Sequence, residues 1–108
     1  MSFRVVTIPP FDKQLKRLLK KFPSLRKEYT ELIGSLEADP EQGTGVGRKC
    51  YKIRLAIASK GKGRSGGARV ITHVYVNGNM VFLLTIYDKS EQTDLSNKEL
   101  EQLLAFIK

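Results

Sequence analysis

The chain has 108 residues, of which 41% are apolar and 28% are charged, a balance typical of one folded domain. It is basic, with 19 Lys and Arg residues against 11 Asp and Glu residues and a formal charge of +8. No apolar run approaches the roughly 20 residues that span a bilayer, and one cysteine with one histidine cannot supply an internal disulfide or a zinc site. We therefore expect a single cytoplasmic domain over residues 1–108, without a secretory signal, a metal, a cofactor or a membrane partner.

A short strand and two helices are expected before residue 39. The run Phe3–Ile8 is rich in β-branched residues and is closed by two prolines, which a strand interior excludes. Apolar residues then recur at the spacing of an amphipathic helix over 11–22 and again over 25–36. Because Pro23 separates the two segments, we expect an antiparallel helical hairpin joined by a tight turn.

Strands follow in the second half of the chain. Residues 39–48 hold three glycines and one proline, so a loop is expected there. From Cys50 apolar and polar residues alternate, as in a strand with one buried face. A basic, glycine-rich loop at Ser59–Gly67 ends this strand. The remaining signals are those of a hairpin: Ala68–Val76, Met80–Tyr87 and the turn Asn77-Gly78-Asn79 between them.

A capping box from Ser96 to Glu99 begins a third helix, giving the order β-α-α-β-β-β-α. Sequential hairpins make the last three strands antiparallel, whereas the first strand pairs either at the edge of the sheet or in its middle. We therefore predict an α+β fold. In it the helical hairpin and the C-terminal helix pack on a small, mainly antiparallel sheet and cover one of its faces.

The basic residues gather in the middle of the chain. Residues 42–87 contain eight Lys and Arg residues and no carboxylate. Such a field attracts polyanions, with nucleic acid as the leading candidate and an acidic protein as the alternative. Lys52 and Arg54 share one face of their strand and Arg69 opens the next, so antiparallel pairing would gather them. Like charges so placed repel, which favours a ligand-binding role for them over the alternative of a solvated sheet rim.

The glycine-rich loop carries the spacing G-x-G-x-x-G at residues 61, 63 and 66. A dinucleotide-binding fingerprint needs a helix directly after it, but a strand follows here, and the other elements of a kinase are absent from the sequence. The loop instead suits a phosphodiester backbone, with a solvated hairpin loop as the alternative. The RNA-binding candidates are the cations of this loop and the basic pair that precedes the strand beginning at Cys50: Lys60, Lys62, Arg64, Arg48 and Lys49.

Three further polar residues leave the last strand together. Tyr87, Lys89 and Glu91 either face the same patch as the strand cations or decorate a loop. Cys50 and His73 have no catalytic partner by motif, so we expect both to serve packing.

A resemblance to the RelE/HigB toxins of bacterial type II toxin–antitoxin modules is carried by the run KIRLAIASKGKGRSGGARVI, followed by VFLLTIYDKSEQTDLS and a final helix. It covers roughly residues 3–107. It implies a RelE-like ribonuclease fold that cuts messenger RNA on the ribosome without a metal, and a cognate antitoxin partner of the helix-turn-helix, HigA-like kind. Lys52 and Arg54 match a basic pair of the family, Arg69 its phosphate-binding arginine, and Lys89 a basic position after the last strand.

The implied reaction is attack by the substrate's own 2′-hydroxyl on the adjacent phosphate, which needs a base, an acid and cations. Arg54 and Arg69 would stabilise the phosphorane. Two alternatives are a ParE-like gyrase poison, which shares the fold, and a non-catalytic module that binds RNA or an acidic protein. The other catalytic candidates share the base, positioning and leaving-group work: Lys52, Lys60 or Lys62 at one end and Tyr87, Lys89 or Glu91 at the other.

Overall fold

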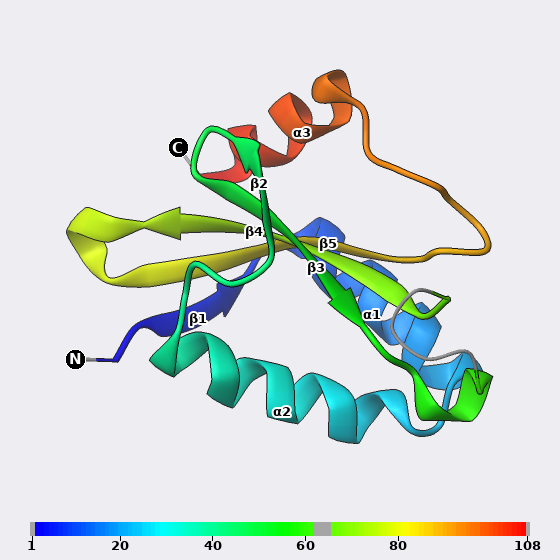
Figure 1. Ribbon diagram of the computed structural model, residues 1–108. Helices are drawn as coiled ribbons and strands as arrows, with labels where there is room; N and C mark the ends of the chain where they lie inside the picture. Colours follow the sequence, from blue (N-terminus) through cyan, green and yellow to red (C-terminus); the bar gives the residue numbers. More distant parts are fainter. Residues whose placement is uncertain (1, 62–65, 108) are drawn as a thin grey trace.

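A computed structural model describes residues 2–61 and 66–107. In this part of the chain five strands form one sheet in the order β1-β5-β4-β3-β2 (Figure 1). The strands are β1 (Arg4–Thr7), β2 (Thr44–Gly47), β3 (Cys50–Leu55), β4 (Ala68–Tyr75) and β5 (Met80–Asp88). The helices are α1 (Pro9–Lys21), α2 (Leu25–Ala38) and α3 (Asn97–Leu104), with short 3₁₀ turns at Ala58–Lys60, Val76–Gly78 and Ala105–Ile107.

The predicted α+β fold is confirmed, and the first strand takes an edge position. β1 runs parallel to β5, with Arg4 opposite Met80 and Thr7 opposite Leu83. β3, β4 and β5 pair antiparallel, as the hairpin signals indicate. Asn79 closes the β4–β5 turn with a positive φ of 51°, the backbone conformation that asparagine tolerates.

The strand β2 was not predicted, and the loop expected over residues 39–48 is wrong in its second half. All four residues of β2 are exposed, so the segment TGVG carries no apolar period. A two-residue turn joins β2 to β3, and both of its residues, Arg48 and Lys49, have positive φ values of 56° and 59°. Turns of this kind favour Asn and Gly, so this basic pair gave no turn signal.

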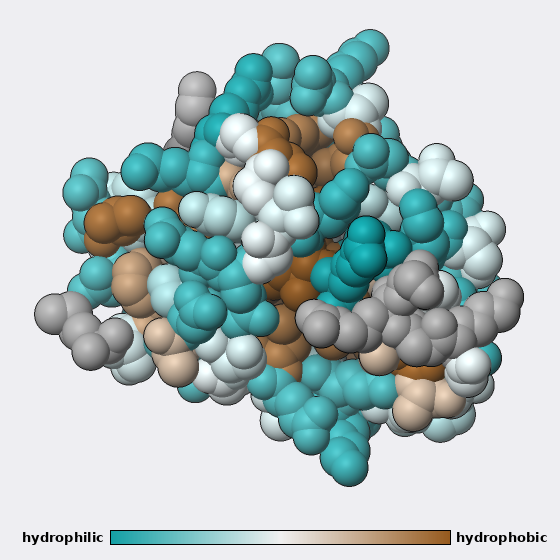
Figure 2. Space-filling model, viewed as in Figure 1, coloured by the Kyte–Doolittle hydropathy of each residue, from teal (hydrophilic) through white to brown (hydrophobic). Residues whose placement is uncertain are grey.

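The core lies between the sheet and the two long helices. The apolar stripes of α1 and α2 are buried, including Phe11, Leu18, Leu25 and Leu36, and they pack with the inward residues of the strands. On the face of the molecule seen in Figure 2, hydrophilic residues predominate and apolar residues appear mainly at the middle and near the top. The burial of both stripes is the physical basis of the predicted helical hairpin.

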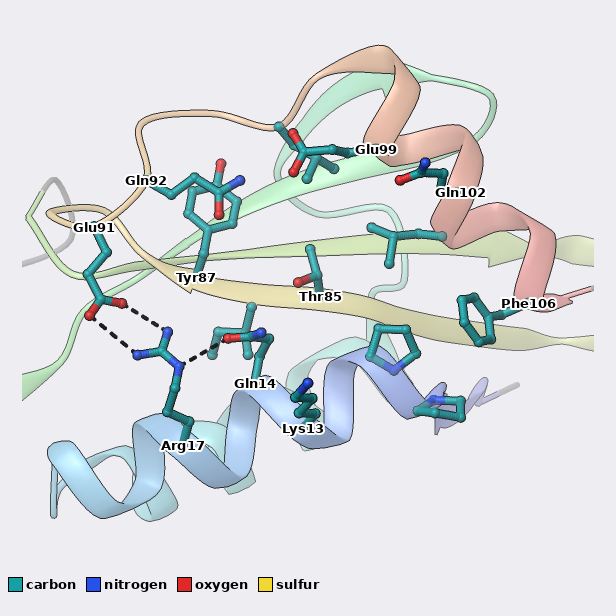
Figure 3. A pocket seen from close by; sticks show the side chains of 15 residues that line it. Lys13, Gln14, Arg17, Thr85, Tyr87, Glu91, Gln92, Glu99, Gln102 and Phe106 are labelled. Carbon is teal, nitrogen blue, oxygen red and sulfur yellow. Dashed lines mark hydrogen bonds and ion pairs between the residues drawn. The ribbon is translucent and has the colours of Figure 1, made fainter.

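The third helix lies on the opposite side of β5 from α1, so the prediction that all helices share one face is wrong. Thr85 and Tyr87 project from β5 toward the side of α3 (Figure 3). The predicted capping box is present: Ser96 Oγ accepts from the Glu99 amide at 3.1 Å, and Glu99 Oε1 accepts from the Ser96 amide at 3.0 Å. Leu100 is the buried residue of α3, and it anchors the helix on this second face.

Two glycines are expected to respond in opposite ways to alanine. Gly34 is exposed within α2, and a Cβ there meets nothing within 4 Å. A Cβ at Gly67 would overlap the Leu55 carbonyl oxygen and lie 3.1 Å from the Ile57 nitrogen. Gly34→Ala should raise the free energy of unfolding by about 0.5–1 kcal/mol, and Gly67→Ala should lower it by about 1–3 kcal/mol. Urea denaturation measures both, and a Gly67→Ala variant as stable as the wild type would contradict this account of the β4 entrance.

Candidate active site

The register of the central strands sets three of the predicted residues in one row, called here the site row: Arg54, Arg69 and Tyr87. Arg54 lies opposite Arg69, and Arg69 lies opposite Tyr87. Directly paired residues of antiparallel strands project from the same face, with Cβ atoms about 4.5–5.5 Å apart. Because Tyr87 projects away from α1 (Figure 3), the whole site row lies on the face of the sheet opposite that helix.

Two lysines lie close to the site row. Lys52 stands two residues before Arg54 on the same strand face, and its Nζ is 3.3 Å from Asp94 Oδ1. A hydrogen bond from the Leu95 amide and another from Lys52 lower the pKa of Asp94, and the charge of Lys89 adds to this effect. Lys89 itself donates from Nζ to the Thr93 carbonyl oxygen at 3.1 Å. Both lysines are therefore within electrostatic reach of one carboxylate beside the row.

Tyr87 brings a buried phenol to the site row. The residue is 4% exposed, and its hydroxyl has no hydrogen-bond partner among the residues that the structure describes. Burial raises the pKa of this phenol, Asp94 and Glu99 raise it further, and Arg69 opposes them. Tyr87 is therefore a protonated O–H donor at neutral pH. An unsatisfied buried hydroxyl costs about 1–3 kcal/mol, and a hydrogen-bonding ligand would relieve that cost.

Arg69 is held within the sheet. The residue is 5% exposed, and its Nη1 donates to the Ala68 carbonyl oxygen at 3.1 Å. Arg54, in contrast, is exposed. The site row thus holds one buried guanidinium group, that of Arg69, and one that is accessible to solvent, that of Arg54.

Glu91 points away from the site row. Its carboxylate lies 2.9 Å from Arg17 Nη2 and 3.0 Å from Lys21 Nζ, both on α1 (Figure 3). These ion pairs attach the start of the segment 89–96 to α1. The structure therefore does not bring Glu91 to the same patch as the strand cations.

Lys60, a candidate for RNA contact, instead pairs with a buried carboxylate. Its side chain is 8% exposed and its Nζ binds Asp88, which is 1% exposed. Burial opposes ionisation of Asp88, but hydrogen bonds from Lys60 and Ser90 outweigh it and hold its pKa at about 2. Lys21 approaches the same carboxylate at 3.6 Å. This ion pair joins the 3₁₀ turn at Ala58–Lys60 to the end of β5.

Two of the remaining RNA-binding candidates lie at the opposite end of β3 from Arg54. Arg48 and Lys49 are exposed at the β2–β3 turn, and Arg48 pairs with Glu101 of α3 at 3.1 Å. Lys62 and Arg64 lie outside the described residues.

Cys50 and His73 face each other across β3 and β4, with Sγ and Nδ1 3.6 Å apart. Burial raises the pKa of the Cys50 thiol to about 11 and lowers the pKa of His73. The pair is therefore a thiol beside a neutral imidazole and lacks the reactive thiolate. Within residues 2–61 and 66–107, no three His, Cys, Asp or Glu side chains are placed to hold a metal ion.

A cleft of about 640 Å³ opens beside Tyr87, between α1, β5 and α3 (Figure 3). Because β1 pairs with β5 only as far as Leu83, the outer edge of β5 is uncovered by β1 beyond that point. The walls of the cleft combine apolar and polar side chains, among them Pro10, Leu103, Phe106, Gln14, Gln92 and Gln102. The buried phenol thus borders a hollow large enough for part of an extended ligand.

Asp94 is the residue of this site that the sequence reasoning missed. It lies 42 positions from its partner Lys52, and no motif or spacing in the sequence links the two. Only the packing of the segment 89–96 over the sheet brings them together.

Comparisons with known proteins agree with this architecture. Residues 12–108 match the family model of the RelE toxin of the RelE/RelB toxin–antitoxin system, so the chain belongs to the RelE toxin family and is the toxin of a toxin–antitoxin pair. The fold is similar to that of an arginine double mutant of E. coli toxin RelE in the free state, with a TM-score of 0.65, 18% identity and 100% of both chains covered. It is also similar to the isolated E. coli RelE toxin, with a TM-score of 0.58, 18% identity, and 96% of this chain and 98% of that one covered.

The family assignment confirms the resemblance seen in the sequence and implies a cognate antitoxin as partner. No helix in the described part of the chain is long and apolar enough to cross a membrane.

Removing the Asp88 carboxylate is expected to be strongly destabilising. Asp88→Asn leaves Lys60 charged and buried without its partner, which should lower the free energy of unfolding at pH 7 by about 3–5 kcal/mol. Because the folded pKa of about 2 lies below the ordinary value, the stability that Asp88 contributes is present above about pH 4 and is lost as pH falls through about 2. Urea denaturation between pH 7 and pH 2 should show a smaller acid loss in the variant than in the wild type. The exposed Glu37→Gln variant is the control, and an Asp88→Asn variant within about 1 kcal/mol of it would contradict the assignment.

Proposed function

We propose that this toxin is a metal-independent endoribonuclease that cleaves messenger RNA on the ribosome, in the cytoplasm. The observation that carries the proposal is the site row, in which two guanidinium groups and a buried phenol share one face of the sheet with Lys52 and Lys89 nearby. Cations of fixed position stabilise the charge that develops on a phosphorane. The basic composition of the site also matches a nucleic-acid substrate.

The proposed reaction is an internal displacement at phosphorus. The RNA 2′-oxygen forms a bond to the adjacent phosphorus while the bond from phosphorus to the 5′-oxygen breaks, which leaves a 2′,3′-cyclic phosphate and a 5′-hydroxyl. A base takes the 2′-hydroxyl proton, and an acid gives a proton to the leaving 5′-oxygen. Arg54 and Arg69 would stabilise the phosphorane. Tyr87, whose raised pKa keeps the phenol protonated, would be the proton donor. Lys52, once it is free of Asp94 and has given its ammonium proton to solvent, would be the base in its neutral amine form.

The other candidates take different parts in this proposal. Lys89 would help to place the phosphate, because it lies within electrostatic reach of the same carboxylate as Lys52. Arg48 and Lys49, with Lys62 and Arg64, would contact the RNA backbone of the message or of the ribosome through charge. Lys60 and Glu91 would act structurally, because each is already ion-paired away from the site row. A helix-turn-helix, HigA-like protein would be the antitoxin.

Replacing Arg54 tests the proposal at an accessible position. Controlled expression of the wild type should arrest growth and produce cuts inside codons of a translated message, mapped by primer extension. Arg54→Ala should reduce cleavage by about 10²–10³-fold, the cost of one transition-state cation, while urea denaturation shows an unchanged fold. Arg69→Lys should also lose activity, because lysine keeps the charge but not the planar fork of donors.

Arg26→Ala is the matched control. It removes an exposed arginine from α2 and should leave cleavage unchanged. Full cleavage by the Arg54→Ala variant would overturn the assignment of the site row. A wild type that blocks DNA replication and leaves the message intact would show a gyrase poison instead.

A further inference from the structure

One carboxylate lies against the cations of the proposed site. Asp94 Oδ1 is 3.3 Å from Lys52 Nζ, and the charge of Asp94 also acts on Tyr87 and Lys89. These three groups come from β3, from β5 and from the residue after β5. The Asp94 carboxylate therefore places an anionic oxygen beside Lys52, Tyr87 and Lys89, the groups that are proposed to act on RNA.

The segment that carries Asp94 is fixed at its start, whereas the Asp94 side chain itself makes few contacts. Its start is attached by Glu91 to α1, and Asp88 just before it is bound to Lys60. Asp94 has a side chain that is 67% exposed, and its ion pair with the sheet is the one with Lys52. Its other hydrogen bonds are local: Oδ1 accepts from the Leu95 amide at 2.8 Å, and the carbonyl oxygen accepts from Gln92 Nε2 at 2.9 Å. Rotation of this side chain thus breaks few contacts.

A phosphodiester can replace such a carboxylate. Both present anionic oxygens that accept hydrogen bonds from an ammonium group. We propose that Asp94 is a built-in competitor of RNA: its carboxylate occupies Lys52 at the place where a phosphate of the RNA binds, and it leaves when the RNA arrives. The identity of the ligand rests on the proposed function, whereas the occupied lysine is a property of the free protein.

A competitor role and a catalytic role for Asp94 predict opposite effects of removing its charge. A competitor lowers the affinity for RNA, so removing its charge strengthens binding. A general base is needed for the reaction, so removing its charge abolishes cleavage and does not strengthen binding. An exposed ion pair is weak and screened by salt, and an RNA that offers several phosphates displaces it readily.

Binding to a non-cleavable RNA tests the proposal directly. The probe is a fluorescent single-stranded oligonucleotide with 2′-O-methyl sugars, and fluorescence anisotropy at fixed low salt gives Kd for the intact chain. Asp94→Asn is expected to bind roughly three- to fivefold more tightly than the wild type, the strength of an exposed ion pair. Glu37→Gln, which makes the same change in net charge on α2, is expected to produce a smaller gain.

A second variant shows whether the gain in RNA affinity depends on Lys52. In a Lys52→Ala background, Asp94→Asn should give no gain beyond that of Glu37→Gln, because the lysine that Asp94 occupies is absent. The proposal is overturned if Asp94→Asn binds no more tightly than Glu37→Gln, or if its gain survives without Lys52.

The measurement separates this proposal from the proposed function. A wild type that cuts no message, together with tighter binding by Asp94→Asn, would refute the nuclease and retain the competitor. A wild type that cuts messages inside codons, together with unchanged binding by Asp94→Asn, would do the reverse.

Discussion

Ile53, Val70 and Ile86 lie opposite one another across β3, β4 and β5, immediately beside the site row, and all three are buried. Because side chains alternate between the two faces of a strand, the burial of these residues beneath the helices obliges the site row to project from the other face. A slip of one residue would turn the apolar row away from the helices and turn the site row toward them. The hydrophobic core therefore keeps two like charges opposite each other, although their repulsion costs stability, and the proposed chemistry depends on that arrangement.

The three carboxylates between residues 88 and 94 divide into two kinds. Asp88 and Glu91 hold the end of β5 and the following turn against Lys60 and α1, where they neutralise basic residues that a count of charges assigns to RNA. Asp94 faces the site row through Lys52, beside the phenol of Tyr87. The field that the proposed RNA substrate would meet is thus set by which cations the carboxylates occupy. The formal charge of +8 conceals this distribution.

The parts of the structure that depend on the alternation of apolar and polar residues, or on local turn and capping motifs, could be predicted from the sequence. The period-two pattern of β3 and its antiparallel pairing with the next strand predict that Arg54 and Arg69 gather on one face, and Ser96 with Glu99 marks the start of α3. Features that depend on tertiary packing could not be predicted from the sequence. β2 is an exposed edge strand without an apolar period, and the face taken by α3 depends on how the segment 89–96 crosses the sheet. The pairing of Lys60 and of Lys52 joins residues distant in sequence, for which periodicity has no signal.

The central claim is that the face of the sheet carrying the site row receives the RNA, and mapping the bound RNA on the protein tests it most directly. In a two-dimensional ¹H–¹⁵N NMR titration with the 2′-O-methyl oligonucleotide, the amides of Lys52–Arg54, Arg69 and Tyr87–Lys89 should shift together, and those of α2 should stay in place. Shifts confined to the exposed faces of α1 and α2, with the site row unaffected, would contradict the account. That result would mean that the basic helices bind the polyanion and that the site row does not.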